Sequence, residues 1–416
     1  MERTLSATLL RKHALSAYQA ALDAVGGRAC VEKHLRVHRP GFVTHIAAVG
    51  KAAVHMTAGA MDVLASQISR ALVITKRGYA EPLFAAAAPV TVMESAHPVP
   101  DDSSLAAGTA LLRFVEAAPR DAGFLFLVSG GASSLAEVLP PGVGADDLSR
   151  INSWLLGSGL PIGDMNRIRK RVSRIKGGRL AAALDGRRAL NLMISDVPGD
   201  DPRVIGSGLL VPHSPDDIRI DDLEPPDWLA AIAGRAPPLP GEACFRGVDS
   251  VIVARPSLAR EAAREACERV GHAVNVHGTL LEGEAVTAGI EAARSLVAGP
   301  PGAQIWASET TVVLPEKPGR GGRCQSLALA AATVLAGRKD AVLLAAGTDG
   351  TDGPGEDAGA LVDGGTIQRG EAMGCSARAS LEAADAGTFL HHSGDLVNTG
   401  PTGTNVMDII IGLKSE

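Results

Sequence analysis

The fold is decided by one stretch, LNLMISDVPG at residues 190–199. Its mostly apolar run, residues 190–194, is typical of a strand buried on both faces of a parallel sheet, and the Pro-Gly pair marks a turn after it. Ligands of open α/β sheets bind at the carboxyl ends of the strands, so Asp196 leaves its strand where chemistry takes place. A carboxylate there can orient a hydroxyl group, accept its proton or bind a metal ion; alternatively, it simply caps a turn.

Working outward from this strand, apolar runs alternate with helical patterns. Strands are predicted at residues 42–49, 71–75, 90–93 and 124–128, with helices between them and a first helix at residues 4–25. This order favours an α/β fold whose N-terminal domain is a doubly wound, largely parallel, Rossmann-like sheet. The proline-rich residues 236–241 are predicted to separate that domain, residues 1–235, from a second α/β domain, residues 236–416. The strand at residues 248–253 is expected to begin the second domain, and the last residues to pack back on the first.

The composition excludes several classes of protein. Of 416 residues, 46% are hydrophobic, 21% charged and only 3% aromatic, with a net charge of -6. A chain of this length and composition can bury two cores, but it offers neither the basic surface nor the aromatic platforms that nucleic acids require. No apolar run approaches the ~20 residues of a membrane span. The five scattered cysteines form no CxxC pair, which favours a reducing cytoplasm over a disulfide framework or a zinc site.

Two glycine-containing loops follow strands in the first half. Gly50 and Lys51 open a helix, whose free N–H groups and partial positive charge favour a phosphate or carboxylate, although an exposed lysine is the simpler alternative. The first glycine of a Walker A motif is absent. The run from Ser129 to Ser134 can form an anion-binding nest, or a tight turn with serine caps. Further on, Lys176 precedes a glycine pair that breaks a basic helix, and this end of the helix could meet an anion.

The second half adds three polar loops. Glu309 and Thr310 precede the loop GRGGRC, in which Arg323 opens a helix and can bind a carboxylate or phosphate in a planar, paired geometry. Asp349 and Asp352 lie in GTDGTDG after a predicted strand and could hold Mg²⁺ or order a substrate hydroxyl. Residues 398–405 form one more Gly/Thr-rich loop. Cations, glycine-rich nests and carboxylates at the ends of strands suit phosphoryl transfer to a small acid.

Together these stretches resemble the class II glycerate kinases, whose C-terminal half is the MOFRL domain. The motifs that carry the resemblance occur in the family's order: VGKA at 49–52, SGG at 129–131, IKGGRL at 175–180, SDVPGD at 195–200, ETT at 309–311, GGR at 321–323, GTDG at 347–350 and GPTGTN at 400–405. The resemblance implies a mixed sheet in the MOFRL domain and an active site in the cleft between the two domains. It also implies phosphorylation of D-glycerate at its 2-hydroxyl by ATP and Mg²⁺, giving 2-phosphoglycerate.

The resemblance also assigns roles to residues. Lys51, Asp196 and Arg323 match the catalytic positions. The residues expected to bind substrate or phosphate are Ser129, Gly130, Gly131, Ser133, Lys176, Glu309, Thr310, Asp349, Thr404 and Asn405. The expected metal ligands are Asp196, Asp349 and Asp352. A homodimer is compatible with the sequence, and no nucleic acid or membrane partner is expected.

The chain departs from the family pattern at several polar positions. Cys324 and Ser326 replace an asparagine and a glutamate, and Met407 stands where a second asparagine is common, so a related hydroxy acid is an alternative substrate. Two other functions stay open. An NAD(P)H-dependent hydroxypyruvate reductase should carry a GxGxxG turn, which the sequence lacks. A non-catalytic sugar-phosphate-binding protein would use the Gly50-Lys51 segment without turnover.

Overall fold

The computed structural model describes residues 6–80 and 89–416 and divides the chain into two compact units. One unit is Gly27–Ala254, and the other joins the N-terminal segment ending at Gly26 to Arg255–Glu416. The two units therefore divide the chain differently from the predicted boundary at residues 235/236. The predicted helix at residues 4–25 belongs to the unit that contains Arg255–Glu416, and its residues 4 and 5 lie outside the described residues.

The unit Gly27–Ala254 is built on a six-stranded sheet with the order β3-β2-β1-β4-β5-β6. All its pairings are parallel. Its elements are α2 (Gly27–Val37), β1 (His45–Val49), α3 (Ala53–Leu64), β2 (Arg70–Lys76), β3 (Val90–Ser95), α5 (Asp102–Glu116), β4 (Phe124–Val128), α6 (Ala132–Leu135), α7 (Ala145–Gly157), α8 (Ile162–Arg171), α9 (Arg179–Ala183), β5 (Ala189–Ile194), α10 (Asp227–Arg235) and β6 (Val248–Ala254). The predicted doubly wound, Rossmann-like sheet is confirmed.

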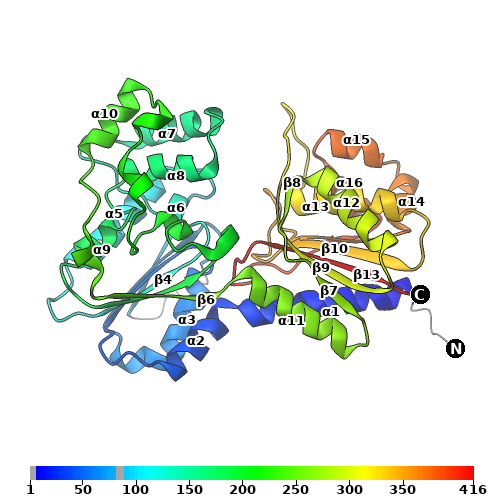
Figure 1. The fold of residues 1–416 in the computed structure, drawn as a ribbon, viewed down its shortest axis with the longest axis horizontal. Coiled ribbons are helices and arrows are strands. Elements are labelled where there is room, and N and C mark those ends of the chain that lie inside the picture. Colours follow the sequence, from blue (N-terminus) through cyan, green and yellow to red (C-terminus); the bar gives the residue numbers. More distant parts are fainter. Residues whose placement is uncertain (1–5, 81–88) are drawn as a thin grey trace. The chain divides into compact units, whose positions relative to one another are not determined.

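Both faces of this sheet are covered, which explains why its central strands are mostly apolar. Helices α2 and α3 lie on one face and α5 and α9 on the other (Figure 1). Every residue of β1, β4 and β5 is buried, as expected for parallel strands between two helical layers. Helices α7, α8 and α10 form a separate small core around Leu148, Ile168 and Leu229.

One strand was predicted in the wrong domain. Strand β6 pairs with β5 in parallel, from Ala189 opposite Val248 onward, so it completes the first sheet instead of beginning the second. The proline-rich residues 236–241 connect α10 to this edge strand within one unit.

The other unit contains a seven-stranded mixed sheet with the order β12-β11-β10-β13-β9-β7, with β8 beside β9. Strands β7 and β8 run parallel to β9, and the remaining pairs are antiparallel. The elements are α1 (Ala7–Val25), α11 (Pro256–Arg269), β7 (Val274–Val276), β8 (Leu281–Glu284), α12 (Ala285–Ala298), β9 (Gly302–Thr311), α13 (Arg323–Leu335), β10 (Ala341–Gly347), β11 (Gly359–Asp363), α14 (Thr366–Ala372), α15 (Ala377–Glu382), α16 (Ala386–Ser393), β12 (Leu396–Val397) and β13 (Asp408–Lys414). The predicted mixed sheet is confirmed.

Helix α1 belongs to this unit because its buried face packs on the mixed sheet beside α11 (Figure 1). Ser6 caps the start of the helix, because its hydroxyl accepts a hydrogen bond from Leu9 N. Tyr18 is buried and donates a hydrogen bond of 2.7 Å to the carbonyl of Gly347 at the end of β10. Sequence periodicity identifies such a helix but does not say which sheet it covers.

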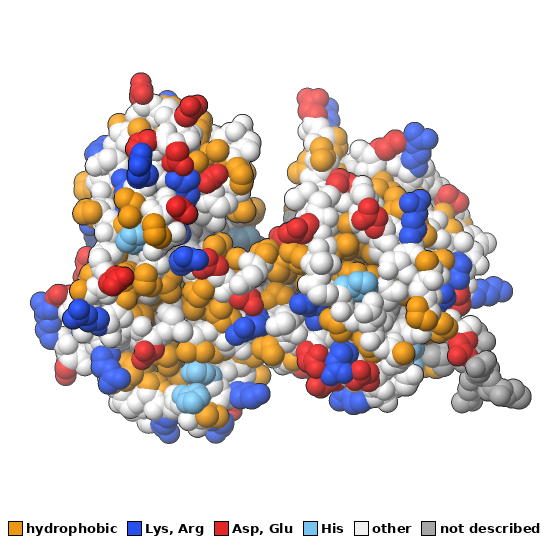
Figure 2. All heavy atoms as spheres, in the orientation of Figure 1, with side chains coloured by type: hydrophobic (Ala, Val, Ile, Leu, Met, Phe, Trp, Pro, Cys, Tyr) orange, Lys and Arg blue, Asp and Glu red, His pale blue; other side chains and the backbone are white. Residues whose placement is uncertain are grey.

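On the face drawn in Figure 2, basic and acidic side chains are interspersed over both units. None of the helices within residues 6–80 and 89–416 has the length and hydropathy that a membrane span needs.

Candidate active site

The strand order of the unit Gly27–Ala254 reverses between β1 and β4, where a doubly wound sheet opens a crevice for ligands. Lys51 follows β1 and Ser129 follows β4. The two loops are joined by hydrogen bonds from Lys51 N to the Gly130 carbonyl (2.9 Å) and from Ala52 N to Ser129 Oγ (3.1 Å). The structure therefore brings two of the predicted phosphate-binding loops into direct contact at the point where the fold places ligands.

Two glycines make this contact possible. Gly50 has φ +137°, and a β-carbon there would lie 2.1 Å from Ser129 Oγ. Gly131 has φ +85°, and a β-carbon there would lie 3.4 Å from Lys51 Cγ and 2.9 Å from His97 Cδ2. The stem of Lys51 thus runs beside Gly131, and no side chain larger than hydrogen fits at either glycine without displacing its neighbours.

Asp196 lies at the same edge of the sheet. It follows β5, which pairs in parallel with β4, and its side chain is half-buried. Ser195 before it is buried and donates its backbone N–H to the Ala254 carbonyl at 2.9 Å. The predicted catalytic residues Lys51 and Asp196 therefore leave the same end of one parallel sheet.

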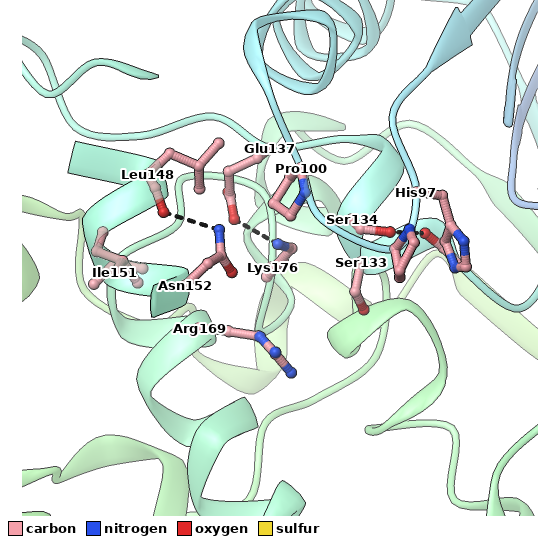
Figure 3. A pocket seen from close by; sticks show the side chains of 13 residues that line it. His97, Pro100, Ser133, Ser134, Glu137, Leu148, Ile151, Asn152, Arg169 and Lys176 are labelled. Atoms are coloured by element: carbon pink, nitrogen blue, oxygen red, sulfur yellow. Dashed lines mark hydrogen bonds and ion pairs between the residues drawn. The ribbon is translucent and has the colours of Figure 1, made fainter. Parts of the chain in front are cut away.

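A cavity of about 200 Å³ lies within this unit, between the Gly131 loop and helices α7 and α8 (Figure 3). It contains two of the predicted phosphate-binding side chains, Ser133 and Lys176, together with polar residues that sequence reasoning missed. The polar lining consists of His97, Ser133, Ser134, Glu137, Asn152, Arg169 and Lys176. Ser133 Oγ lies 2.8 Å from Ser207 Oγ.

Lys176 already has a partner in this cavity. Its ammonium group forms an ion pair with Glu137, and both residues are buried, with 2% and 3% of their surface exposed. Glu137 also accepts hydrogen bonds from Ser173 Oγ (2.5 Å) and from Val138 N (2.9 Å). Because its charge is balanced, Lys176 is a weaker anion site than the sequence predicts.

The basic helix was predicted to run up to the glycine pair, but α8 ends at Arg171, so Lys176 and the glycine pair lie in the turn between α8 and α9. Arg179, the first residue of α9, serves the fold. Gly177 and Gly178 have φ of +61° and +83°. Arg179 donates to the carbonyls of Pro237 (2.8 Å) and Lys170 (2.5 Å). Burial lowers the pKa of Arg179 to about 10, in keeping with a guanidinium group that satisfies buried carbonyls.

Arg323 lies in the other unit, at the start of α13. Its Nε donates to Asp408 Oδ2 at 2.6 Å, and its Nη1 forms an ion pair with Glu309. Burial opposes the charged form, but Asp408 and Glu309 outweigh it and raise the pKa of Arg323. The two carboxylates fix the orientation of the guanidinium group. Asp408 was missed, because one aspartate at the start of a strand carries no local signal.

Asp352, a predicted metal ligand, caps helix α13. Its two carboxylate oxygens accept hydrogen bonds from Cys324 N (3.0 Å) and Gln325 N (2.7 Å). Burial raises the pKa of Asp352 to about 7, against the effect of these hydrogen bonds. Gly322 allows the close approach, because a β-carbon there would lie 2.3 Å from Asp352 Oδ1. Both carboxylate oxygens of Asp352 therefore already accept hydrogen bonds from backbone N–H groups at the start of α13.

The remaining predicted residues gather near the same end of the mixed sheet. The loop containing Asp349 touches the 398–405 loop, because a β-carbon on Gly350 would lie 2.0 Å from the Gly400 carbonyl. Thr404 donates its hydroxyl to the Val25 carbonyl at 2.6 Å, whereas the buried Thr310 hydroxyl has no hydrogen-bond partner. Asn405 is buried.

The predicted metal ligands do not form one cluster within a unit. Asp349 and Asp352 share a loop, and Asp196 lies in the other unit. Among the described residues, no group of three or more histidine, cysteine, aspartate or glutamate side chains is arranged to hold a metal ion. Mg²⁺ needs only one or two protein carboxylates when substrate phosphates supply the other ligands, so Asp196 and Asp349 each fit such a role.

Comparison with known proteins gives a consistent result. The family described as "Domain of unknown function (DUF4147)" matches residues 13–222, and the MOFRL family matches residues 302–408. The chain is 35% identical to the D-glycerate 2-kinase of Thermotoga maritima, over 88% of this chain and 90% of that protein. An Agrobacterium vitis protein provisionally named a hydroxypyruvate reductase is 36% identical, over 86% of this chain and 96% of that protein. The crystal structure of a glycerate kinase from Thermotoga maritima has a TM-score of 0.84 at 33% identity and covers 98% of this chain and 100% of that one.

Proposed function

Because the chain belongs to the glycerate kinase family with DUF4147 and MOFRL segments, we propose that it phosphorylates D-glycerate with ATP. The 2-hydroxyl oxygen attacks the γ-phosphorus, the bond from that phosphorus to the β–γ bridging oxygen breaks, and 2-phosphoglycerate and ADP result. The observation that carries the proposal is the contact between the Lys51 and Ser129 loops where the strand order reverses. A kinase of this kind works by positioning and charge neutralisation, which these loops supply.

Each group at this edge of the sheet receives a role. Asp196 orients the 2-hydroxyl and accepts its proton, or holds the metal ion. Lys51 neutralises charge on the transferred phosphoryl group, and the N–H groups of the Ser129–Gly131 loop cradle phosphate oxygens. Ser133 and Lys176 line the adjoining cavity.

The unit Arg255–Glu416 contributes a second set of groups. Arg323, held by Asp408 and Glu309, neutralises phosphate or carboxylate charge. Thr310, Asp349 and the 398–405 loop serve as further polar contacts for the substrates. Asp196 or Asp349 would hold Mg²⁺, which would offset the negative charge of the phosphates.

The cellular setting follows from the cysteines. All five are free thiols, and we place the protein in a reducing compartment such as the cytoplasm. The homodimer stays a prediction.

The test is a direct comparison of the three candidate functions. Purified protein is incubated with ATP, Mg²⁺ and D-glycerate, and ADP is measured by chromatography, with a matched reaction that omits the acid. Formation of ADP that depends on D-glycerate supports the kinase. Oxidation of NADH by hydroxypyruvate without such ADP would support the reductase. Binding of a phosphosugar with no turnover of ATP would support the binding protein.

A further inference from the structure

One charged group in the cavity of the unit Gly27–Ala254 is not used by the assignments above. Arg169 of α8 lines the cavity (Figure 3) and is half-buried. Among the residues that the structure describes, its one hydrogen bond runs from Nη1 to Asn166 Oδ1 at 3.1 Å, and it forms no ion pair. Burial lowers the pKa of Arg169, and the nearby Glu137 carboxylate opposes this effect only in part. A partly buried guanidinium group whose hydrogen-bond partner is neutral carries a desolvation cost that an anionic ligand would offset.

The charges of the cavity point to one small anion. Lys176 and Glu137 cancel each other in a buried ion pair, so Arg169 gives the cavity a net positive charge. Asn152 lies beside it, with its Nδ2 donating to the Leu148 carbonyl at 2.9 Å (Figure 3). The volume of about 200 Å³ is below the ~300–1,000 Å³ of pockets that hold drug-sized ligands. A three-carbon acid suits this volume better than a nucleotide.

The cavity also adjoins the predicted site of phosphoryl transfer. Gly131 and His97 line it, and a β-carbon on Gly131 would lie within 2.9 Å of His97 Cδ2 and 3.4 Å of Lys51 Cγ, so the stem of Lys51 lies beside this part of the lining. A ligand anchored at Arg169 would therefore extend toward Lys51.

We propose that Arg169 binds the carboxylate of the acceptor hydroxy acid and thereby selects acids over uncharged alcohols, with Asn152 and Ser133 contacting the acid's polar groups. This assignment rests on the proposed kinase function. It places the carboxylate in the unit Gly27–Ala254 and leaves Arg323 to phosphate. Arginine suits the task because its planar fork matches a carboxylate.

The experiment measures KM for D-glycerate and for ATP in Arg169→Gln, Arg169→Lys and the wild type. Arg113→Gln serves as the matched control, because Arg113 is exposed on α5. We expect Arg169→Gln to raise KM for D-glycerate by at least ~30-fold, the range for losing a buried charge contact, with KM for ATP within about twofold. Arg169→Lys keeps the positive charge but lacks the planar fork, so its KM for D-glycerate should lie between those of the wild type and Arg169→Gln. The preference for D-glycerate over glycerol, which lacks the carboxylate, should narrow in Arg169→Gln.

Several results would overturn the assignment. An unchanged KM for D-glycerate in Arg169→Gln would do so, and so would a rise confined to the KM for ATP. Should Arg169→Gln fail to fold, Asn152→Asp adds a repelling carboxylate beside Arg169, and an unchanged KM there contradicts the proposal. If the wild type does not phosphorylate D-glycerate, the proposed function fails. Calorimetric titration of the wild type and Arg169→Gln with D-glycerate then decides the carboxylate site alone, because equal binding by both would refute it.

Discussion

Replacing Glu137 by glutamine should lower the stability of the protein much more than the small change in side-chain shape implies. The side chain keeps its volume and can still accept hydrogen bonds from Ser173 and Val138, but Lys176 loses its counter-charge. Glu137 and Lys176 are only 3% and 2% exposed, so water solvates the remaining ammonium group poorly. Removing one partner of a buried ion pair costs about 3–5 kcal/mol, and we expect Glu137→Gln to lower the free energy of unfolding by that amount.

The assay is urea unfolding followed by tryptophan fluorescence in a Trp306→Phe background. Of the three tryptophans, Trp154 and Trp228 lie in the unit that contains the ion pair, so this background reports on that unit. The matched control is the double variant Glu137→Gln with Lys176→Met, which removes both charges and should recover most of the loss. A loss below about 1 kcal/mol in the single variant, or a double variant no more stable than the single one, would refute the reasoning.

Three further predictions concern the loops. Asp196→Asn and Lys51→Ala should each lower kcat by ~100-fold or more while circular dichroism stays unchanged; near-normal turnover in either would contradict its role. Gly50→Ala should destabilise the protein by about 1–3 kcal/mol in urea unfolding, because its φ is +137° and its β-carbon would meet a hydroxyl, whereas Gly163→Ala, in open space, should not. The stability of Asp352→Asn relative to the wild type should rise between about pH 4 and pH 7. With a native pKa of about 7, the wild-type native state keeps a proton that the unfolded chain releases, which costs up to ~1.4 kcal/mol per pH unit. A difference independent of pH would contradict this.

The edge of the parallel sheet could be predicted from the sequence because its strands are local and apolar. Each of β1, β4 and β5 was expected within a few residues of its observed bounds, and the glycine, lysine and aspartate after them follow directly. Parallel strands bring their carboxyl ends to one edge, so the sequence predicts that Lys51 and the Ser129 loop share that edge. Their direct contact depends on the pairing of β1 with β4, which a local pattern does not record.

The assignment of elements to units could not be predicted from local pattern. Strand β6 and helix α1 have the expected periodicities, but a pattern does not record which sheet a strand joins or a helix covers. The predicted meeting of Arg323 with Lys51 and Asp196 stays a prediction for the same reason, since Arg323 belongs to the other unit.

Two predicted residue roles differ from the structure because of a side-chain pairing and a backbone conformation that the sequence does not show. Lys176 looked like an anion site, but Glu137, 39 positions away, takes its charge. Met407 looked like a lost substrate contact, yet its φ is +70°, a conformation that asparagine adopts more easily than methionine. An asparagine at this position would favour the backbone conformation. Its replacement by Met407 is therefore weaker evidence for a different substrate than the sequence implied.

The most direct test of the central claim is the position of the transferred phosphate. The product formed from ATP and D-glycerate is passed to enolase, and the ultraviolet absorbance of phosphoenolpyruvate is recorded. The account predicts immediate conversion, because only 2-phosphoglycerate is an enolase substrate. A product that enolase accepts only after phosphoglycerate mutase is added would contradict it.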